Sequence, residues 1–303
     1  MAGTLSNCRH SIFLALLLFS FLAQAGSVFQ KGLANGTERL AVREEFIDIR
    51  NVTAYCGTTC VFREFSLLVQ EGCNTAILGP NGSGKSTLMK LLSRDIYPVY
   101  KPESHVRVFG RERWNVWELR NRLGILSDDL QHDYLHGALG INVILSGFYA
   151  SIDIWQHQTF TSGELEKAGE VMDQLGIGDL KNRPFGAMST GQQRRFLLGR
   201  ALINNPDALL FDEPTSGLDL KASFHYLETL RTLMRSGKTV LLVTHHLHEI
   251  PPEIERVVLL REGRIVSDGK KAGVLTSEAL SALFDYPLHV VEVNGYYQVL
   301  PAV

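Results

Sequence analysis

The segment that most restricts how this chain can fold is a glycine-rich loop between a predicted strand and a predicted helix. Residues 79–87 match the pattern G-x-x-x-x-G-K-[ST]. They follow the apolar run Thr75–Leu78 and open the helical pattern Ser86–Ser93. Glycines let backbone N–H groups point inward around phosphate oxygens, so this context predicts a nucleotide-binding α/β fold. The loop consists of Gly79, Pro80, Asn81, Gly82, Ser83, Gly84, Lys85, Ser86 and Thr87.

Four side chains in two segments suggest the chemistry of this site. Lys85 supplies a cation to the β- and γ-phosphates, and the Ser86 hydroxyl is placed to bind Mg²⁺. The acidic pair Asp212 and Glu213 follows the apolar run Ala208–Phe211. At the tip of a strand, Asp212 can hold Mg²⁺, usually through water, and Glu213 can polarise an attacking water as a general base. The two segments together predict a nucleoside triphosphatase.

Strand and helix patterns alternate from Phe46 onward, which indicates a largely parallel sheet. The predicted strands are Thr75–Leu78, Leu123–Leu126, Ala208–Phe211, Val240–Val243 and Val257–Leu260. The predicted helices are Ser86–Ser93, Ser162–Leu175, Gly191–Ile203 and Leu220–Ser236. Residues 130–185 are helical in pattern and carry scattered aromatics, so they read as a helical insertion. A helix at Ser277–Phe284 and a hairpin turning at Asn294-Gly295, between His289–Val293 and Tyr296–Leu300, are predicted at the C-terminus.

Composition excludes several other classes of protein. The chain has 303 residues, of which 45% are hydrophobic and 20% charged, so it can bury a core. Its formal charge of −2 argues against binding nucleic acid mainly through bulk charge. A mean hydropathy of +0.01 excludes a polytopic membrane protein, and four cysteines are too few for a disulfide scaffold.

Three later motifs follow the phosphate loop in order. Met188-Ser189-Thr190-Gly191-Gln192 opens a helix, Ser216-Gly217-Leu218-Asp219 follows the acidic pair, and His245 comes directly after a strand. Together with the loop, these motifs resemble the nucleotide-binding domain of ABC ATPases over residues 46–269. The resemblance implies an α/β fold of the P-loop NTPase type, with a RecA-like core, an antiparallel β-subdomain and a helical subdomain inserted at about residues 130–185. Residues 270–303 are then a C-terminal tail.

The resemblance also implies roles for individual residues. Ser189, Thr190, Gly191 and Gln192 form the signature that acts on ATP held by a second copy of the chain, and the helix dipole behind them favours the γ-phosphate. His245 contacts the γ-phosphate, and Asp219 links the two sites of the dimer. Tyr55 lies about where the family stacks an aromatic ring on adenine, although an ordinary strand tyrosine is the alternative.

Two segments depart from the usual family pattern. The signature reads MSTGQ where LSGGQ is commonest, but Thr190 still offers its N–H, so we expect function to survive. The family usually carries a glutamine after the strand Leu123–Leu126, where it senses Mg²⁺ and contacts the permease. Asp128 occupies that position here, and Gln131 comes three residues later. Either could serve, and Asp128 could bind Mg²⁺ or its waters.

The leading hypothesis is the ATP-dependent motor of a transporter. Two copies would bind ATP and Mg²⁺ and drive separate transmembrane permease subunits, with no nucleic acid partner. The segment Leu145–Trp155 resembles the molybdenum-type subgroup, near the importers of iron chelates. Phe148, Tyr149 and Trp155 either form a socket for the permease or pack within the insertion. The alternatives are a soluble ABC ATPase and a catalytically silent subunit.

An apolar segment near the N-terminus allows three interpretations. Residues Ile12–Ala25 follow a basic start and end in an A-x-A cleavage pattern, as in a secretory signal, and they are short for a spanning helix. Residues 1–40 are therefore a signal or anchor, an organelle-targeting segment, or an extension from a misplaced start. An extracellular space does not supply ATP, so we favour a tether or a spurious extension. The expected location is the cytoplasmic face of a membrane, or an organelle interior.

Overall fold

The computed structural model describes residues 44–302, except for the side chain of Asp128. The signal-like segment Ile12–Ala25 lies outside the described residues. Among residues 44–302, none of the helices combines the length and the apolar character needed to cross a bilayer.

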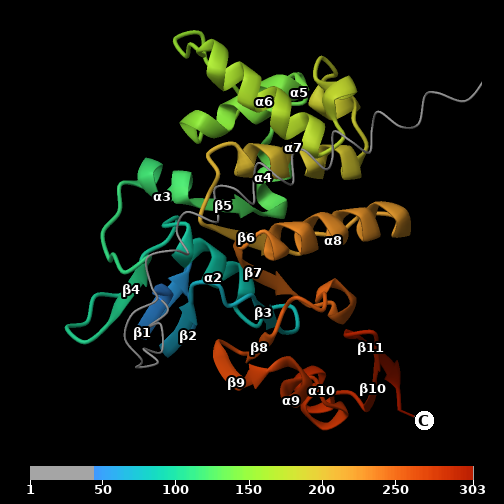
Figure 1. Cartoon of the computed structure of the whole chain (residues 1–303). Coiled ribbons are helices and arrows are strands. Elements are labelled where there is room, and N and C mark those ends of the chain that lie inside the picture. Colours follow the sequence, from blue (N-terminus) through green and yellow to red (C-terminus); the bar gives the residue numbers. More distant parts are fainter. Residues whose placement is uncertain (1–43, 303) are drawn as a thin grey trace, which may run out of the picture. The chain divides into compact units, whose positions relative to one another are not determined.

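The central sheet has six strands in the order β5-β6-β7-β3-β8-β9 (Figure 1). These are β3 (Thr75–Leu78), β5 (Leu123–Leu126), β6 (Ala208–Asp212), β7 (Thr239–Thr244), β8 (Arg256–Arg261) and β9 (Arg264–Lys270). Every neighbouring pair is parallel except β8 and β9. The five predicted strands are confirmed, and β9 is added at the edge. Strands β3, β6 and β7 read as continuous apolar runs because both faces of the sheet are covered.

Two hydrophobic clusters lie on opposite faces of this sheet. Ala76 and Leu78 belong to one cluster, which also contains buried residues of α7 (Thr190–Leu202) and α8 (Leu220–Arg235). Ile77, between them, belongs to the other cluster, with α2 (Lys85–Leu92). Alternate residues of a strand point to opposite faces, so each strand contributes to both cores. The four predicted helices are confirmed as α2, α6 (Ser162–Gln174), α7 and α8.

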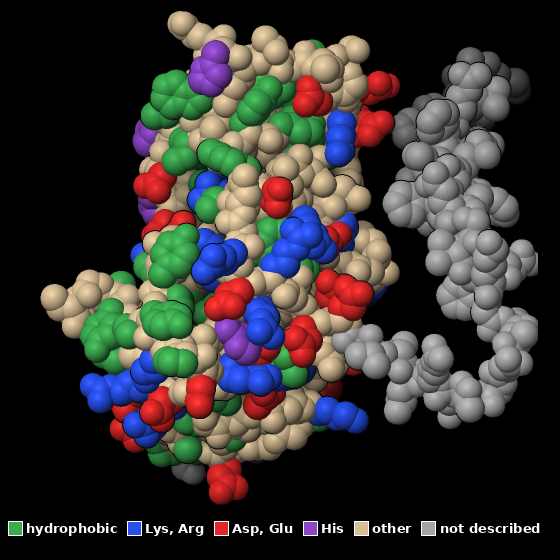
Figure 2. All heavy atoms as spheres, turned by 90° about the vertical axis from the view of Figure 1, so that its left-hand side faces the viewer, with side chains coloured by type: hydrophobic (Ala, Val, Ile, Leu, Met, Phe, Trp, Pro, Cys, Tyr) green, Lys and Arg blue, Asp and Glu red, His purple; other side chains and the backbone are tan. Residues whose placement is uncertain are grey.

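A three-stranded antiparallel sheet in the order β2-β1-β4 covers the same side as α2. Its strands are β1 (Glu45–Cys56), β2 (Thr59–Gln70) and β4 (His105–Val108). Helix α3 (Val116–Arg122) follows and leads into β5. The face carrying β4 and α3 presents basic and acidic side chains next to each other (Figure 2).

The segment predicted as a helical insertion contains α4 (Asp128–Asp133), α5 (Gly140–Leu145), the 3₁₀ turn η1 (Ser146–Tyr149), α6, η2 (Gly178–Leu180) and η3 (Phe185–Ala187). It packs against α7 at close range. A Cβ added to Gly147 would lie 2.4 Å from the carbonyl oxygen of Arg200 in α7. Only a residue without a Cβ allows that approach.

The C-terminal tail contains α9 (Lys271–Val274), α10 (Ser277–Phe284), β10 (Leu288–Val293) and β11 (Tyr296–Pro301). The predicted hairpin is confirmed. Asn294 and Gly295 have φ angles of 54° and 80°, as a two-residue turn with both residues in the left-handed region requires. Leu280, Leu283 and Tyr297 are buried in the same cluster as α7 and α8, so the tail shares the main core.

Candidate active site

The phosphate loop approaches neighbouring strands closely at two of its glycines, Gly79 and Gly84. Gly84 precedes α2 with a φ of 110°, and a Cβ there would lie 3.0 Å from the ring of Phe62. A Cβ at Gly79 would lie 2.2 Å from the carbonyl oxygen of Leu260. At Gly79 the backbone passes closer to β8 than a residue with a Cβ allows, and at Gly84 a Cβ would require the Phe62 ring of β2 to shift.

The loop encloses the ammonium group of Lys85. Its Nζ donates to the carbonyl oxygens of Gly79 at 2.8 Å and Pro80 at 3.0 Å. Burial lowers the pKa of Lys85, and the nearby carboxylates of Glu213 and Asp212 act in the opposite direction. A buried cation surrounded by neutral carbonyl groups favours an entering anion such as a phosphate group.

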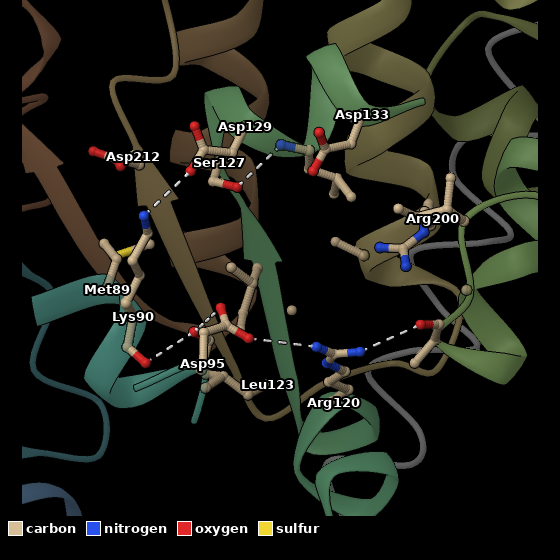
Figure 3. Close-up of a pocket in the computed structure, with 18 of the residues that line it drawn as sticks. Met89, Lys90, Asp95, Arg120, Leu123, Ser127, Asp129, Asp133, Arg200 and Asp212 are labelled. Carbon is tan, nitrogen blue, oxygen red and sulfur yellow. Dashed lines mark hydrogen bonds and ion pairs between the residues drawn. The ribbon is translucent and has the colours of Figure 1, made fainter. Parts of the chain in front are cut away.

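Ser86 and Asp212 line one cavity of about 400 Å³. Figure 3 shows Asp212 at the end of β6 on one side of this cavity, Ser127 and Asp129 beside the end of β5, and Arg200 on the opposite side. A hydroxyl and a carboxylate oxygen are hard ligands of the kind that Mg²⁺ prefers. Asp128 is the first residue of α4, directly after Ser127, and its side chain lies outside the described part of the chain.

Glu213 and His245 meet at the ends of two neighbouring strands. His245 Nδ1 lies 2.6 Å from Glu213 Oε1. Glu213 has a φ of 45°, in the left-handed region, so the backbone turns sharply after β6. Because of this turn, the side chains of Asp212 and Glu213 point in different directions. The Glu213 side chain points to His245, which follows β7.

The signature residues form the start of α7. Ser189 is the N-cap, its Oγ accepts from Gln192 N, and the Gln192 side chain accepts from Ser189 N, which makes a capping box. Ser189 and Thr190 are exposed, so the positive end of the helix dipole faces solvent. Asp219 caps α8 by accepting from Ala222 N at 2.8 Å.

The signature residues and the predicted metal ligands Ser86 and Asp212 line separate cavities. Ser189, Thr190, Gly191, Gln192 and Asp219 line a cavity of about 640 Å³. None of these five residues lines the cavity that contains Ser86 and Asp212. Within one chain, Lys85 lies near Asp212 and Glu213, and Glu213 contacts His245. The predicted signature residues line a cavity that none of these four residues lines.

Tyr55 lies near the end of β1, paired across the hairpin with Cys60. Its side chain is 45% exposed, so a planar ring could stack on it. In the helical insertion, Trp155 is 59% exposed, whereas Phe148 and Tyr149 pack against Phe160.

The sequence analysis did not single out two side chains around the site, Arg194 and Glu249, and it did not predict the contact that Gln131 makes. Arg194 of α7 donates from Nη1 to the carbonyl oxygen of Glu213 at 3.3 Å. Gln131 Nε2 donates to Gln193 Oε1 at 2.8 Å, so Gln131 contacts the signature helix. Glu249 is a fully buried acid after His245. Glu249 ends η4 (Leu247–Glu249), and three of the four residues before it are histidines, so its sequence context carried no signal of burial.

Comparison with known proteins identifies the family of the chain. The model of the ABC transporter family matches residues 62–216. The uncharacterized ABC transporter ATP-binding protein YlmA of Bacillus subtilis (strain 168) is 31% identical over 250 residues, which are 81% of this chain and 93% of YlmA. The hemin import ATP-binding protein HmuV of Rhodopseudomonas palustris (strain HaA2) is 31% identical over 270 residues, which are 84% of this chain and 97% of HmuV.

A solved structure matches the fold as well. The dimeric ATP-binding cassette MJ0796, in a post-hydrolysis state with ADP and Pi, aligns with a TM-score of 0.61 and 26% identity, covering 74% of this chain and 98% of that one. The relatives support the transporter interpretation over a soluble ATPase. The chain therefore belongs to the ABC transporter family and is an ATP-hydrolysing subunit of that family.

Proposed function

We propose that two copies of this subunit hold two ATP molecules between them and that hydrolysis drives a separate membrane permease. The observation that carries this proposal is the division of the site within one chain. Lys85 lies near Asp212 and Glu213, Glu213 contacts His245, and Ser86 and Asp212 line one cavity. The exposed signature lines another cavity. A second copy can supply its signature to the first copy's nucleotide. The ADP-bound dimer of MJ0796 supports this arrangement.

In the proposed mechanism, ATP places its phosphates in the loop of residues 79–87. The Lys85 ammonium exchanges the neutral carbonyl groups of Gly79 and Pro80 for phosphate oxygens, which carry negative charge and accept stronger hydrogen bonds. The ring of Tyr55 stacks on adenine. Ser86 and Asp212, with Asp128 as a further candidate, would hold Mg²⁺. Held there, Mg²⁺ would supply positive charge beside the β- and γ-phosphates.

Glu213 accepts the proton of the attacking water in this mechanism. His245 fixes the Glu213 carboxylate through its Nδ1 and uses its other ring nitrogen for the γ-phosphate. Ser189, Thr190, Gly191 and Gln192 of the second copy bind the γ-phosphate at the N-terminus of α7. Asp219 connects the two sites. The bond between Gln131 and Gln193 connects the loop after β5 to the signature helix, whichever of Asp128 and Gln131 senses the metal.

The proposal extends to domain limits and location. Residues 46–269 form the ATP-binding domain, with the helical insertion at about 130–185, and residues 270–303 form the tail. The protein is peripheral, on the cytoplasmic face of a membrane, or inside an organelle if residues 1–40 are a targeting peptide. HmuV is a hemin import protein, which directs the search for the permease first to importers of iron chelates.

Purification from gently solubilised native membranes tests the proposal. A polytopic protein should co-purify with the chain, and the sample should hydrolyse ATP. Recovery of an active chain solely in the soluble fraction, with no membrane partner, would contradict a permease motor. Peptide masses from the same sample show whether residues 1–25 are kept, removed or never made.

A further inference from the structure

Glu249, at the end of η4, is a buried carboxylate with an unusual set of partners. Its residue is 0% exposed. Its Oε1 accepts from the Thr215 backbone N–H at 3.0 Å and from the Thr215 hydroxyl. Its Oε2 accepts from the Thr244 hydroxyl. Each carboxylate oxygen is thus bonded to a different segment of the chain.

The two segments that Glu249 joins are the ones that carry the reacting side chains. Thr215 lies two residues after Glu213, and Thr244 directly precedes His245. The Thr244 hydroxyl also accepts from His246 N at 2.9 Å, so the bonded network continues past His245. Strands β6 and β7 are neighbours in the sheet (Figure 1), but their pairing ends at Asp212, before Glu213 begins. Beyond the sheet, Glu249 adds a buried connection between the two loops, next to the Glu213–His245 contact and the bond from Glu213 N to Val243 O.

The backbone at Glu213 needs such support. Its φ of 45° is a left-handed conformation that an L side chain occupies only when surrounding contacts hold it there. Glu213 N donates to Val243 O at 2.9 Å, Arg194 binds the Glu213 carbonyl, and Glu249 fixes Thr215 on the C-terminal side. An error of about 1 Å in the position of a catalytic group can lower a rate about 100-fold, so this support bears on the rate.

We infer that Glu249 is a positioning residue for ATP hydrolysis, which holds the Glu213 and His245 loops at the separation that lets the two side chains meet. The inference rests on the proposed roles of Glu213 and His245. Glu249 touches neither nucleotide nor water in this scheme. It acts through the hydroxyl and N–H of Thr215 and the hydroxyl of Thr244, so removing either hydroxyl should loosen one loop while the buried core stays filled.

The test uses paired variants at the two threonines, because Glu249→Ala would empty a fully buried site and could unfold the protein. Thr215→Val and Thr244→Val keep the branched shape and remove the hydroxyl. Thr215→Ser and Thr244→Ser keep the hydroxyl and remove a buried methyl group. The control Glu253→Gln removes another partly buried acid, which pairs with Arg231 and Arg235 away from the site. Measurements on the full chain are kcat, KM for ATP, affinity for a fluorescent ATP analogue, and Tm.

The expected result is a loss in kcat of about 10- to 100-fold in both valine variants, with KM within about threefold of wild type, as for an interaction needed mainly in the transition state. The serine variants should stay within about threefold of wild type in kcat even where their Tm is lower. Glu253→Gln should lower Tm without lowering kcat.

Two results would overturn the inference. One is a valine variant with wild-type kcat. The other is a serine variant that loses as much kcat as its valine counterpart, because activity would then follow stability and not the hydroxyl. Failure of the proposed function appears differently, as an active Glu213→Gln variant, and it would overturn the inference too. If Glu213→Gln is inactive while the valine variants are fully active, the proposed function stands and only the positioning role of Glu249 is refuted.

Discussion

Replacing Glu213 with glutamine isolates the general base from the rest of the site. Glu213 Oε1 lies 2.6 Å from His245 Nδ1, and glutamine keeps an oxygen acceptor at the same length. The backbone bonds of Glu213, to Val243 O and from Arg194 Nη1, do not depend on the charge of its side chain. Lys85, Ser86 and Asp212 are unchanged. Glu213→Gln should therefore fold and bind ATP, and it should lose only the proton acceptor.

The expected loss in kcat follows from that single change. A positioned general base contributes about 10²- to 10⁴-fold, which corresponds to about 3 to 5 kcal/mol of activation free energy. KM for ATP should change little, because the residues that bind the phosphates are intact. ATP-bound dimers that cannot turn over should accumulate. Steady-state phosphate release measures kcat, and size-exclusion chromatography with light scattering in ATP and Mg²⁺ measures the dimer.

Glu262→Gln is the matched control. Glu262 also has a left-handed φ, of 50°, but its side chain is 85% exposed in the turn between β8 and β9. The same chemical change there should leave kcat within about twofold, as is usual for surface substitutions. Hydrolysis by Glu213→Gln at the wild-type rate would refute the assignment of the base. An equal loss of kcat in Glu262→Gln would show that removing one negative charge anywhere on the chain lowers the rate, whether or not the residue lies at the site.

Three further predictions concern stability and nucleotide affinity. Gly84→Ala should weaken ATP binding and lower the free energy of unfolding by about 1–3 kcal/mol, measured by urea titration, because of its positive φ and the nearby Phe62 ring; unchanged stability would contradict the close approach. Ser189→Ala should lower the free energy of unfolding by about 0.5–2 kcal/mol, because it removes the capping box of α7. Ser189→Thr keeps a hydroxyl at the N-cap and should retain most of the wild-type free energy of unfolding. Burial raises the pKa of Glu253, but its bonds to Arg231 and Arg235 outweigh this and lower the pKa overall. Its stabilising contribution is therefore fully present above about pH 4.5 and is lost as pH falls through the lowered pKa. The Tm of wild type should exceed that of Glu253→Gln at pH 7, and the two Tm values should converge in acid. A difference in Tm that persists in acid would show that the ion pair is not its source.

Local patterns in the sequence were enough to identify the main elements. The five predicted strands of the sheet are four- to six-residue apolar runs, and burial on both faces is what gives them that pattern. The Asn294-Gly295 turn was predictable because few residues accept two successive left-handed conformations. The phosphate loop was predictable because its glycines and Lys85 are contiguous in the chain. Each of these features is encoded within about ten residues.

The antiparallel sheet was expected from the family resemblance alone. Its long strands β1 and β2 contain irregular register near Val52 and Ala54, which breaks the simple alternation of buried and exposed residues. The sequence also left open whether Gln131 reaches the nucleotide. The tertiary structure directs it to Gln193, because α4 lies beside the start of α7.

Only the tertiary structure decided which distant residues meet. Glu213 and His245 are 32 positions apart, and they pair because β6 and β7 are neighbours in the sheet. Glu249 joins Thr215 and Thr244 for the same reason. Ser86 of the phosphate loop and the signature of the same chain, in contrast, line different cavities. Hydrophobic periodicity shows which face of an element is buried, but it does not show which element packs next to it. The sequence therefore identified the reacting side chains, and the order of the strands in the sheet decided which of them meet.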